Sequence, residues 1–249
     1  MGGGTARRAQ YLEALGIDRY VPRRPGAVPS ADSSPPGISP PSPVAPQPAV
    51  LPPAMHAEWE ALAAQVRACT RCGLQASRTQ TVFGVGDRRA ELLVVGEAPG
   101  ADEDRQGEPF VGRAGQLLNS MLRAMRAPRE TVYIANVLKC RPPGNRDPTP
   151  GEVRCCLPYL QRQIDLLSPR LMLAVGRIAA QNLLGTDTPI GKLRGTVHRF
   201  GTQGTPLIVT YHPAYLLRSP GEKRKSWLDL RFVRRELARL RAQARAAGA

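Results

Sequence analysis

The hydrophobic residues of this chain form short continuous apolar runs and longer stretches with apolar residues at helical spacing. The apolar runs predict buried strands at residues 92–96, 131–136, 171–176 and 207–211, and "GTVHRF" at 195–200 predicts one more. The helical stretches predict helices at 56–67, 114–126, 150–167 and 178–184, with a basic amphipathic helix near the C-terminus. This alternation predicts an α/β fold, a three-layer αβα arrangement around a mostly parallel sheet.

The N-terminal part of the chain has a different composition. Residues 1–21 predict a short helix over 6–20, and residues 22–53 are dense in proline and serine. Such a composition cannot bury a core, so we expect a disordered linker whose proline runs leave a partner-binding role open. The folded domain is expected at 54–240, with a frayed tail at 241–249.

Charge narrows the function classes. The chain carries a formal net charge of +15 over 249 residues, and its hydrophobic content of 42% allows a sizeable core. A strongly basic protein favours a polyanionic partner, first nucleic acid and second an anionic membrane surface. The chain shows neither the apolar core of a signal peptide nor the roughly 20 apolar residues that span a bilayer. We therefore expect a cytoplasmic protein whose cysteines are thiols or metal ligands rather than disulfides.

Four of the five cysteines have a spacing that indicates a metal site. Cys69 and Cys72 form a C-x2-C pair, and Cys140 and Cys156 lie far downstream. The helix predicted at 150–167 turns Cys156 towards its apolar face and Cys155 away from it, so Cys156 is the expected fourth ligand. Spacing alone leaves zinc and an iron–sulfur cluster open.

Polar residues gather where the predicted strands end. "GEAPG" at 96–100 follows the first strand, Asn136 ends the second and His212 follows the last. Ligands of open α/β sheets bind beyond the carboxyl ends of the strands. Phe110, in a loop just before the next helix, would either pack on the core or serve as a stacking platform for a planar ligand. The amide of Asn136 can donate one hydrogen bond and accept another, which fits a pyrimidine edge with one N–H beside one carbonyl, as in uracil.

Four segments resemble the family 4 uracil-DNA glycosylases, the iron–sulfur type. They are "GEAPGADED" (96–104), "GEPFVGRAGQLL" (107–118), "NVLKCRPPGNRDPTP" (136–150) and "HPAYLLR" (212–218). The resemblance covers residues 57–235, in order and with the four cysteines. It implies a uracil-DNA glycosylase fold and a [4Fe–4S] cluster on Cys69, Cys72, Cys140 and Cys156. It also implies an enzyme that flips uracil out of DNA and hydrolyses its N-glycosidic bond, leaving an abasic site. No lysine is clearly placed in the pocket for Schiff-base chemistry, so we expect the enzyme to be monofunctional.

The resemblance further implies roles for the pocket residues. Phe110 would stack on the uracil ring and Asn136 would read its edge, while His212 would stabilise the negative charge that develops on uracil O2. The implied uracil-binding set comprises Gly96, Glu97, Ala98, Phe110, Asn136 and His212.

A carboxylate in this pocket would favour the cationic sugar or position the attacking water. Glu97 and Glu103 are the candidates, alongside His212 as the third catalytic residue. Because Ala98 stands where other uracil-DNA glycosylases carry Asp or Asn, the motif leaves the water-activating residue open.

The segment after His212 is a candidate DNA contact. Leu216 and Leu217 would either wedge into the gap left by the flipped base or begin a core-packing helix, and Arg218 would hold phosphate. Lys192, Arg194 and the run at 222–226 are either further phosphate contacts or solvated surface.

We expect a monomer that acts on uracil-containing DNA, single- or double-stranded, with an N-terminal extension able to tether a repair or replication partner. A related glycosylase with a broader range of bases is one alternative. A non-catalytic nucleic-acid-binding module with a metal staple is another. An enzyme of free nucleotides is disfavoured, because the chain has no "GxxxxGK[ST]" phosphate loop.

Overall fold

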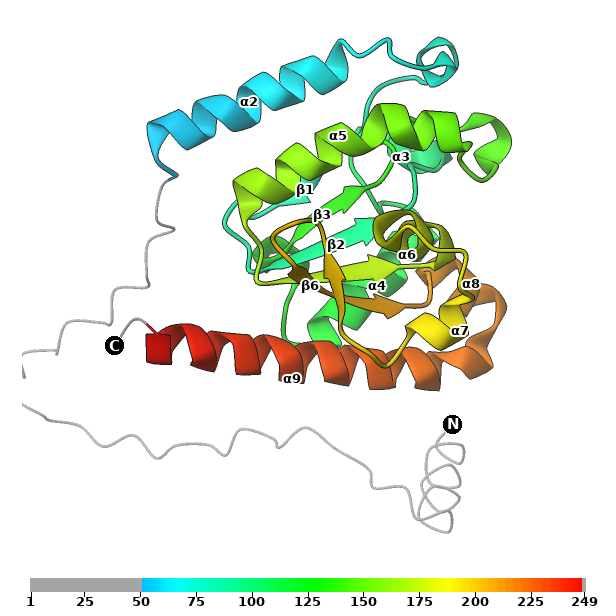
Figure 1. Cartoon of the computed structure of the whole chain (residues 1–249). Helices are drawn as coiled ribbons and strands as arrows, with labels where there is room; N and C mark the ends of the chain where they lie inside the picture. The colour runs from blue at the N-terminus through cyan, green and yellow to red at the C-terminus, as the bar shows by residue number, and fades with distance from the viewer. Residues whose placement is uncertain (1–50, 248–249) are drawn as a thin grey trace, which may run out of the picture. The chain divides into compact units, whose positions relative to one another are not determined.

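A computed structural model of the protein describes residues 51–247, so the helix and nearly all of the linker predicted for the N-terminal part lie outside the described residues. Within these residues, a six-stranded sheet has the order β1-β3-β2-β4-β6-β5 (Figure 1). The inner strands β2 (Leu92–Gly96), β3 (Tyr133–Asn136), β4 (Leu171–Val175) and β6 (Thr205–Thr210) run parallel. The edge strands β1 (Val85–Gly86) and β5 (His198–Phe200) pair antiparallel with their neighbours. The prediction of a mostly parallel sheet is confirmed.

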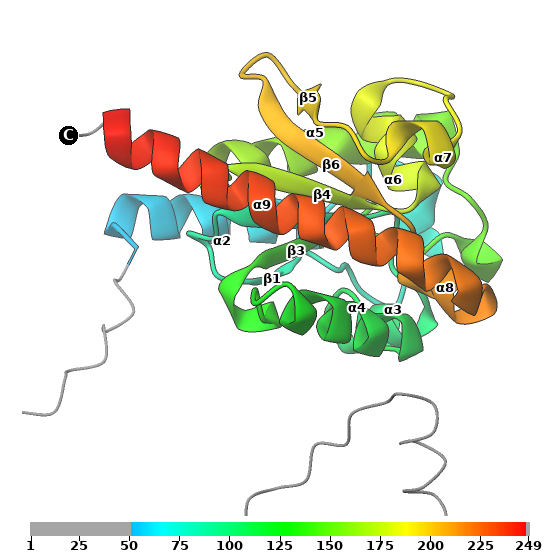
Figure 2. The same ribbon diagram turned by 90° about the horizontal axis from the view of Figure 1, so that it is seen from below.

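Helices cover both faces of the sheet, as the αβα prediction requires. In Figure 1, α2 (Pro53–Arg67) and α5 (Pro150–Leu167) lie above the sheet and α9 (Lys223–Ala247) lies below it. Figure 2 shows α9 crossing the lower face beside α4 (Arg113–Ala124). The remaining helices are α3 (Ala101–Gln106), α6 (Arg177–Leu184), α7 (Ile190–Leu193) and α8 (Pro213–Arg218), with short 3-10 turns at Gly73–Ala76, Arg129–Thr131, Pro143–Asn145 and Pro220–Glu222.

Alternate residues of β2 supply two separate cores. Successive side chains of a strand point to opposite faces, and because this strand is central, both faces are buried. Leu93 and Val95 pack with Trp59 of α2 in one core. Leu92 and Val94 pack in the other core, with residues of α4 and α9. The continuous apolar run that predicted this strand therefore reflects burial on both sides.

Local signals placed some helix ends well and missed others. The predicted start of α5 is confirmed, because the main-chain N–H of Glu152 donates to Thr149 Oγ1 at 3.3 Å and the Thr149 N–H donates to Glu152 Oε2 at 2.8 Å. The short helices α3 and α7 were not predicted, and α8 agrees with one of the two interpretations of Leu216 and Leu217, that of a core-packing helix. A frayed tail was expected from residue 241. This prediction is wrong for residues 241–247, because α9 continues to Ala247. Arg241 there donates to Glu91 Oε2 at 2.6 Å.

None of the helices within residues 51–247 combines the length and apolar character needed to cross a membrane.

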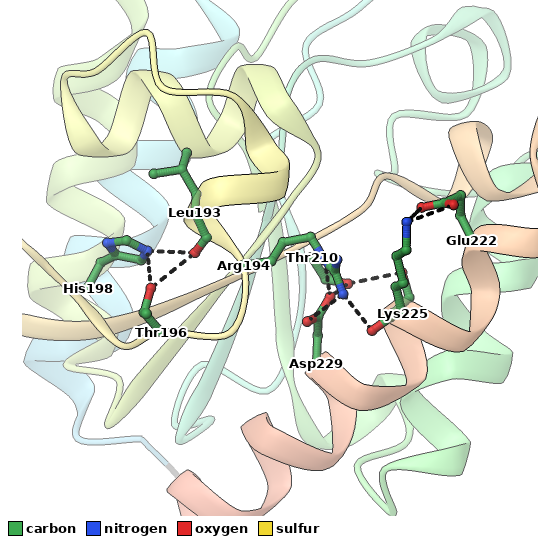
Figure 3. Close-up of polar contacts among 9 residues, drawn as sticks. Leu193, Arg194, Thr196, His198, Thr210, Glu222, Lys225 and Asp229 are labelled. Carbon is green, nitrogen blue, oxygen red and sulfur yellow. Dashed lines mark hydrogen bonds and ion pairs between the residues drawn. The ribbon is translucent and has the colours of Figure 1, made fainter.

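A buried ion pair fastens α9 to the sheet (Figure 3). Asp229 of α9 is 3% exposed and accepts hydrogen bonds from Arg194 Nε at 2.7 Å and from Arg194 Nη2 at 2.9 Å. Thr210, at the end of β6, donates to the same carboxylate at 2.8 Å. Arg194 also donates to the carbonyl oxygen of Lys225 at 2.7 Å. Arg194 therefore has a structural role and is not a free phosphate contact.

Replacing Asp229 with alanine should lower the free energy of unfolding by about 3–5 kcal/mol, because Arg194 would stay buried without its partner. Chemical denaturation of the two proteins measures this difference. Glu222→Ala is the matched control, since its ion pair with Lys225 lies at the surface and should matter little. Equal effects of the two substitutions would contradict a special role for the buried pair.

Candidate active site

A cleft of about 760 Å³ opens at the carboxyl ends of the parallel strands. Its walls come from the segments that follow β2, β3, β4 and β6. Seven of the expected site residues line it: Glu97, Ala98, Glu103, Phe110, Asn136, His212 and Arg218. Gly96, Leu216 and Leu217 are not part of the lining. The strand ends thus bring together residues that are more than 100 positions apart in the chain.

Gly96 gives Asn136 and Phe110 the space that they occupy. The register of β2 and β3 pairs Gly96 with Asn136. A Cβ atom added to Gly96 would lie 2.3 Å from Asn136 Oδ1 and 2.6 Å from Phe110 Cζ, distances too short for any side chain. Gly96 therefore contributes to the pocket indirectly: its lack of a side chain leaves room for Asn136 and Phe110.

The amide of Asn136 is a buried group that lacks a partner. Asn136 is 2% exposed, and within the described residues its Oδ1 atom accepts no hydrogen bond. Buried amide oxygens are nearly always paired, because the loss of water hydrogen bonds is otherwise uncompensated. An unpaired acceptor that borders a cleft is suited to an N–H group of a ligand.

The loop that carries Phe110 is strained and held on both sides. Phe110 has a φ angle of 57°, which is unusual for a residue with a side chain. Its carbonyl oxygen accepts a hydrogen bond from Arg129 Nη1 at 3.3 Å. The next two main-chain N–H groups, of Val111 and Gly112, donate to Glu103 Oε1 at 2.9 and 3.2 Å. These contacts keep the aromatic ring fixed in the cleft wall.

The acidic stretch after β2 is explained largely by helix α3. Its first turn holds three carboxylates, which the positive end of the helix dipole stabilises. Asp104 accepts the Thr79 N–H at 3.0 Å, and Asp102 pairs with Arg105. Glu103 Oε2 accepts the Gly100 N–H at 3.1 Å. Because main-chain donors occupy both Glu103 oxygens, the geometry favours a loop-holding role for Glu103 over the water activation expected from sequence.

Glu97 is the carboxylate that stays available in the cleft. The pKa of Glu97 is raised to about 7, chiefly by burial and also by the neighbouring carboxylate of Asp147, with the positive charge of Arg177 opposing both. Asp147 itself is paired with Arg177 at 2.7 Å. A carboxyl group with this pKa can change its protonation state near neutral pH.

His212 is held as a neutral hydrogen-bond donor. It is the N-cap residue of α8, and its Nδ1 atom accepts the Ala214 N–H at 3.1 Å. Burial lowers the pKa of His212 to about 4, with a further contribution from the positive charge of Arg218. The neutral ring therefore carries its proton on Nε2. Its centroid lies 5.7 Å from that of the Phe110 ring.

Helix α8 decides between the two interpretations of the leucines. Leu216 is 1% exposed and packs in the core shared by α4 and α9, so its expected role as a DNA wedge is wrong in this conformation. Leu217 is half-buried outside the cleft, and Arg218 is exposed at the cleft wall. The helix turns one leucine inward because α8 packs on α4.

The sequence interpretation missed several residues of the cleft. Tyr211 and Tyr215 flank His212 in the lining, with ring centroids 5.1 Å apart. Arg194 lies over the Tyr211 ring at 4.5 Å, so the ion pair of Figure 3 also supports this wall. The signal was present in "YHPAY", where two aromatic residues surround the histidine.

Of the cations expected at the DNA-binding face, only Arg218 lines the cleft. Arg146, Arg177 and Arg218 line it, whereas Lys192 and the run at 222–226 do not. Arg146 and Arg177 lie in segments that follow β3 and β4 and were not among the expected phosphate contacts.

The cysteines line a second, smaller cavity. Its walls include Cys69, Cys72, Cys140, Cys155 and Cys156. The main-chain N–H of Lys139 donates to Cys156 Sγ at 3.1 Å, and Arg78 Nη1 donates to Cys140 Sγ at 3.1 Å. Cys155 instead donates to the carbonyl oxygen of Arg71 at 3.2 Å. Within residues 51–247, no three Cys, His, Asp or Glu side chains converge as ligands of a single ion.

Comparisons with known proteins agree with this architecture. A family model described as the uracil DNA glycosylase superfamily matches residues 83–232. The type-4 uracil-DNA glycosylase of Archaeoglobus fulgidus is 48% identical over 162 residues, which cover 63% of this chain and 81% of that protein. The type-4 enzyme of Thermotoga maritima is 44% identical over 162 residues, 64% of this chain and 83% of that protein.

A type-5 uracil-DNA glycosylase from Thermus thermophilus is more distant. It is 32% identical over 178 residues, which cover 64% of this chain and 81% of that protein. The type-4 relatives match over similar shares of their length at clearly higher identity. The chain therefore belongs to the uracil-DNA glycosylase superfamily and, within it, to the type-4 family.

Proposed function

We propose that this protein excises uracil from DNA by hydrolysing its N-glycosidic bond and leaving an abasic site. The unpaired Oδ1 atom of Asn136 at the cleft carries this proposal. Uracil offers a ring N–H between two carbonyl groups, so the Asn136 amide can accept from the N–H and donate to the adjacent oxygen. Phe110 supplies an aromatic ring beside the amide for a planar base. The relatives named uracil-DNA glycosylases support the same substrate.

Bond cleavage depends on stabilising charge that develops as the base leaves. When the bond between C1′ and N1 breaks, its electron pair moves onto the base and gives uracil anionic character at O2. The Nε2–H group of neutral His212 is suited to donate to that oxygen, and a preorganised donor acts most strongly on the charge of the transition state. The sugar becomes cationic at the same moment.

Glu97 is the candidate that acts on the sugar side. As a carboxylate it stabilises the cationic sugar and orients water, which adds to C1′ and passes its proton to that carboxylate. Within the described residues the cleft lining contains no lysine, so no amine is placed there for Schiff-base chemistry. This supports a monofunctional hydrolytic enzyme.

DNA would bind along the cationic rim of the cleft. Arg146, Arg177 and Arg218 stand at the cleft. Arg146 is paired with Glu152 and Arg177 with Asp147, whereas no ion pair holds Arg218 within the described residues, so Arg218 is the arginine best placed to donate to a phosphate. The formal net charge of +15 adds a general attraction to polyanions. The flipped nucleotide would then reach the base pocket from this rim.

We further infer that Cys69, Cys72, Cys140 and Cys156 hold a [4Fe–4S] cluster. The four thiols border one cavity, and N–H donors point at two of the sulfurs, as is usual around iron–sulfur clusters. A single zinc ion would require four sulfurs about 2.3 Å from one point, a convergence that the described residues lack. When bound, the cluster would add its binding free energy to the stability of the domain.

The first test is excision from an oligonucleotide with one deoxyuridine, followed by alkali and detection of strand cleavage. The wild-type protein should cleave this substrate and leave its thymine counterpart intact. Asn136→Ala should lower the rate by at least about 100-fold, the scale of losing one preorganised hydrogen-bonding group. Asn182→Ala is a matched control, because Asn182 does not line the cleft and its amide donates to the main-chain carbonyl oxygen of Ile178, one turn earlier in α6. A non-catalytic binding module would show no cleavage with any variant.

The pH dependence of excision should report on Glu97. Since the pKa of Glu97 is raised to about 7, kcat/KM should rise with pH as the carboxyl group ionises through that value. His212, whose pKa is about 4, stays neutral around pH 7, so its titration does not change kcat/KM in that range. Glu97→Gln should remove the rise and lower the plateau. If kcat/KM of Glu97→Gln still rises around pH 7, the titrating group is a residue other than Glu97.

Cysteine variants test the metal site separately from activity. After anaerobic purification, Cys156→Ala should contain little iron and acid-labile sulfide and should unfold at a lower temperature. Cys155→Ala is the neighbouring control and should keep both. Equal iron loss from the two variants would overturn the choice of Cys156, and zinc in place of iron would overturn the cluster.

A further inference from the structure

Lys139 is a buried lysine to which the mechanism above assigns no role. It is 1% exposed, and it is the only lysine among the buried polar residues of 51–247. Its Nζ atom donates to the carbonyl oxygen of Asn136 at 2.9 Å and to Gln163 Oε1 at 2.6 Å. Gln163 in turn donates to the carbonyl oxygen of Phe83 at 2.9 Å, which orients its amide. Two of the three Nζ donors are thereby directed at fixed acceptors.

The segment 136–140 joins the base pocket to the cysteine cavity. The main-chain N–H of Lys139 donates to Cys156 Sγ at 3.1 Å, and the next residue is Cys140. Val137 N–H donates to the carbonyl oxygen of Gly96 at 2.9 Å, which extends the pairing of β3 with the end of β2. A single short stretch is therefore bonded to the cleft floor at one end and to two cysteines at the other.

We propose that Lys139 is a positioning residue that holds the main chain of Asn136, and through it the base-reading amide, with the cysteine cavity as its anchor. The carbonyl oxygen of Asn136 is buried, so losing its contact with Nζ leaves an unsatisfied group and allows the peptide to shift. A shift of about 1 Å in a positioned group can cost about 100-fold in rate. The inference rests on the proposed role of Asn136 in binding uracil.

A double-mutant cycle on the deoxyuridine oligonucleotide tests this inference. Lys139→Met should lower kcat/KM by about 10–100-fold, the usual effect of removing a group that orients a site residue. In the Asn136→Ala background, Lys139→Met should lower kcat/KM by less than about 3-fold. The amide that Lys139 positions is already missing there, so the two substitutions act on the same interaction. Equal losses in the two backgrounds, or wild-type rates for Lys139→Met, would overturn the proposal.

Two further measurements separate positioning from stability and from metal binding. The double variant Lys139→Met/Gln163→Leu removes both partners of the Nζ–Oε1 hydrogen bond, so it should recover part of the thermal stability lost in Lys139→Met. It should not recover the excision rate, because the carbonyl oxygen of Asn136 still lacks its donor. If Lys139→Met alone does not fold, this double variant replaces it in the excision assay. A wild-type excision rate in the double variant would refute the positioning role of Lys139.

Iron content should be unchanged in every variant, because the N–H donor to Cys156 belongs to the main chain. Iron loss in proportion to activity would assign Lys139 to the metal site instead. Failure of the proposed function has a different signature, in which Asn136→Ala itself excises uracil at the wild-type rate or no protein excises it.

Discussion

The parallel pairing of Gly96 with Asn136 is the contact on which the candidate active site depends. It places a residue without a side chain beside a buried amide, and Phe110 enters the space that a Cβ would fill. A parallel pairing also brings both strand ends to the same edge of the sheet. The cleft, the strained Phe110 loop and the unpaired Asn136 oxygen all follow from this arrangement at the ends of β2 and β3.

Burial tunes the two titratable groups of the cleft in opposite directions. Desolvation disfavours a charged group, so it raises the pKa of Glu97 to about 7 and lowers the pKa of His212 to about 4. At neutral pH this leaves a neutral donor for the leaving base and a carboxyl group able to ionise. One physical effect thus supplies both kinds of group that the proposed reaction needs, one for the anionic base and one for the cationic sugar.

The cysteine cavity lies close to the strand end that carries Asn136. Cys69 and Cys72 follow α2, Cys140 follows β3 and Cys156 lies in α5, so the cavity joins three segments that are distant in the chain. Lys139 connects one wall of this cavity with the main chain of Asn136. A metal centre there would constrain the strand end that presents the amide, even though it lies outside the cleft lining.

Local patterns in the sequence were sufficient for the inner strands, the longer helices and the capped start of α5, because each depends on residues close together in the chain. The strand-end motifs likewise indicated Asn136, Phe110 and His212 as neighbours, since a parallel sheet places strand ends at one edge. Only the tertiary structure decided which polar groups are already occupied. Glu103 accepts hydrogen bonds from main-chain N–H groups, and Arg194 is paired with Asp229 of α9. The tertiary structure also decided that the apolar Leu216 packs in the core with α4. These outcomes depend on which helix packs against which strand, and that information is spread over residues far apart in the sequence.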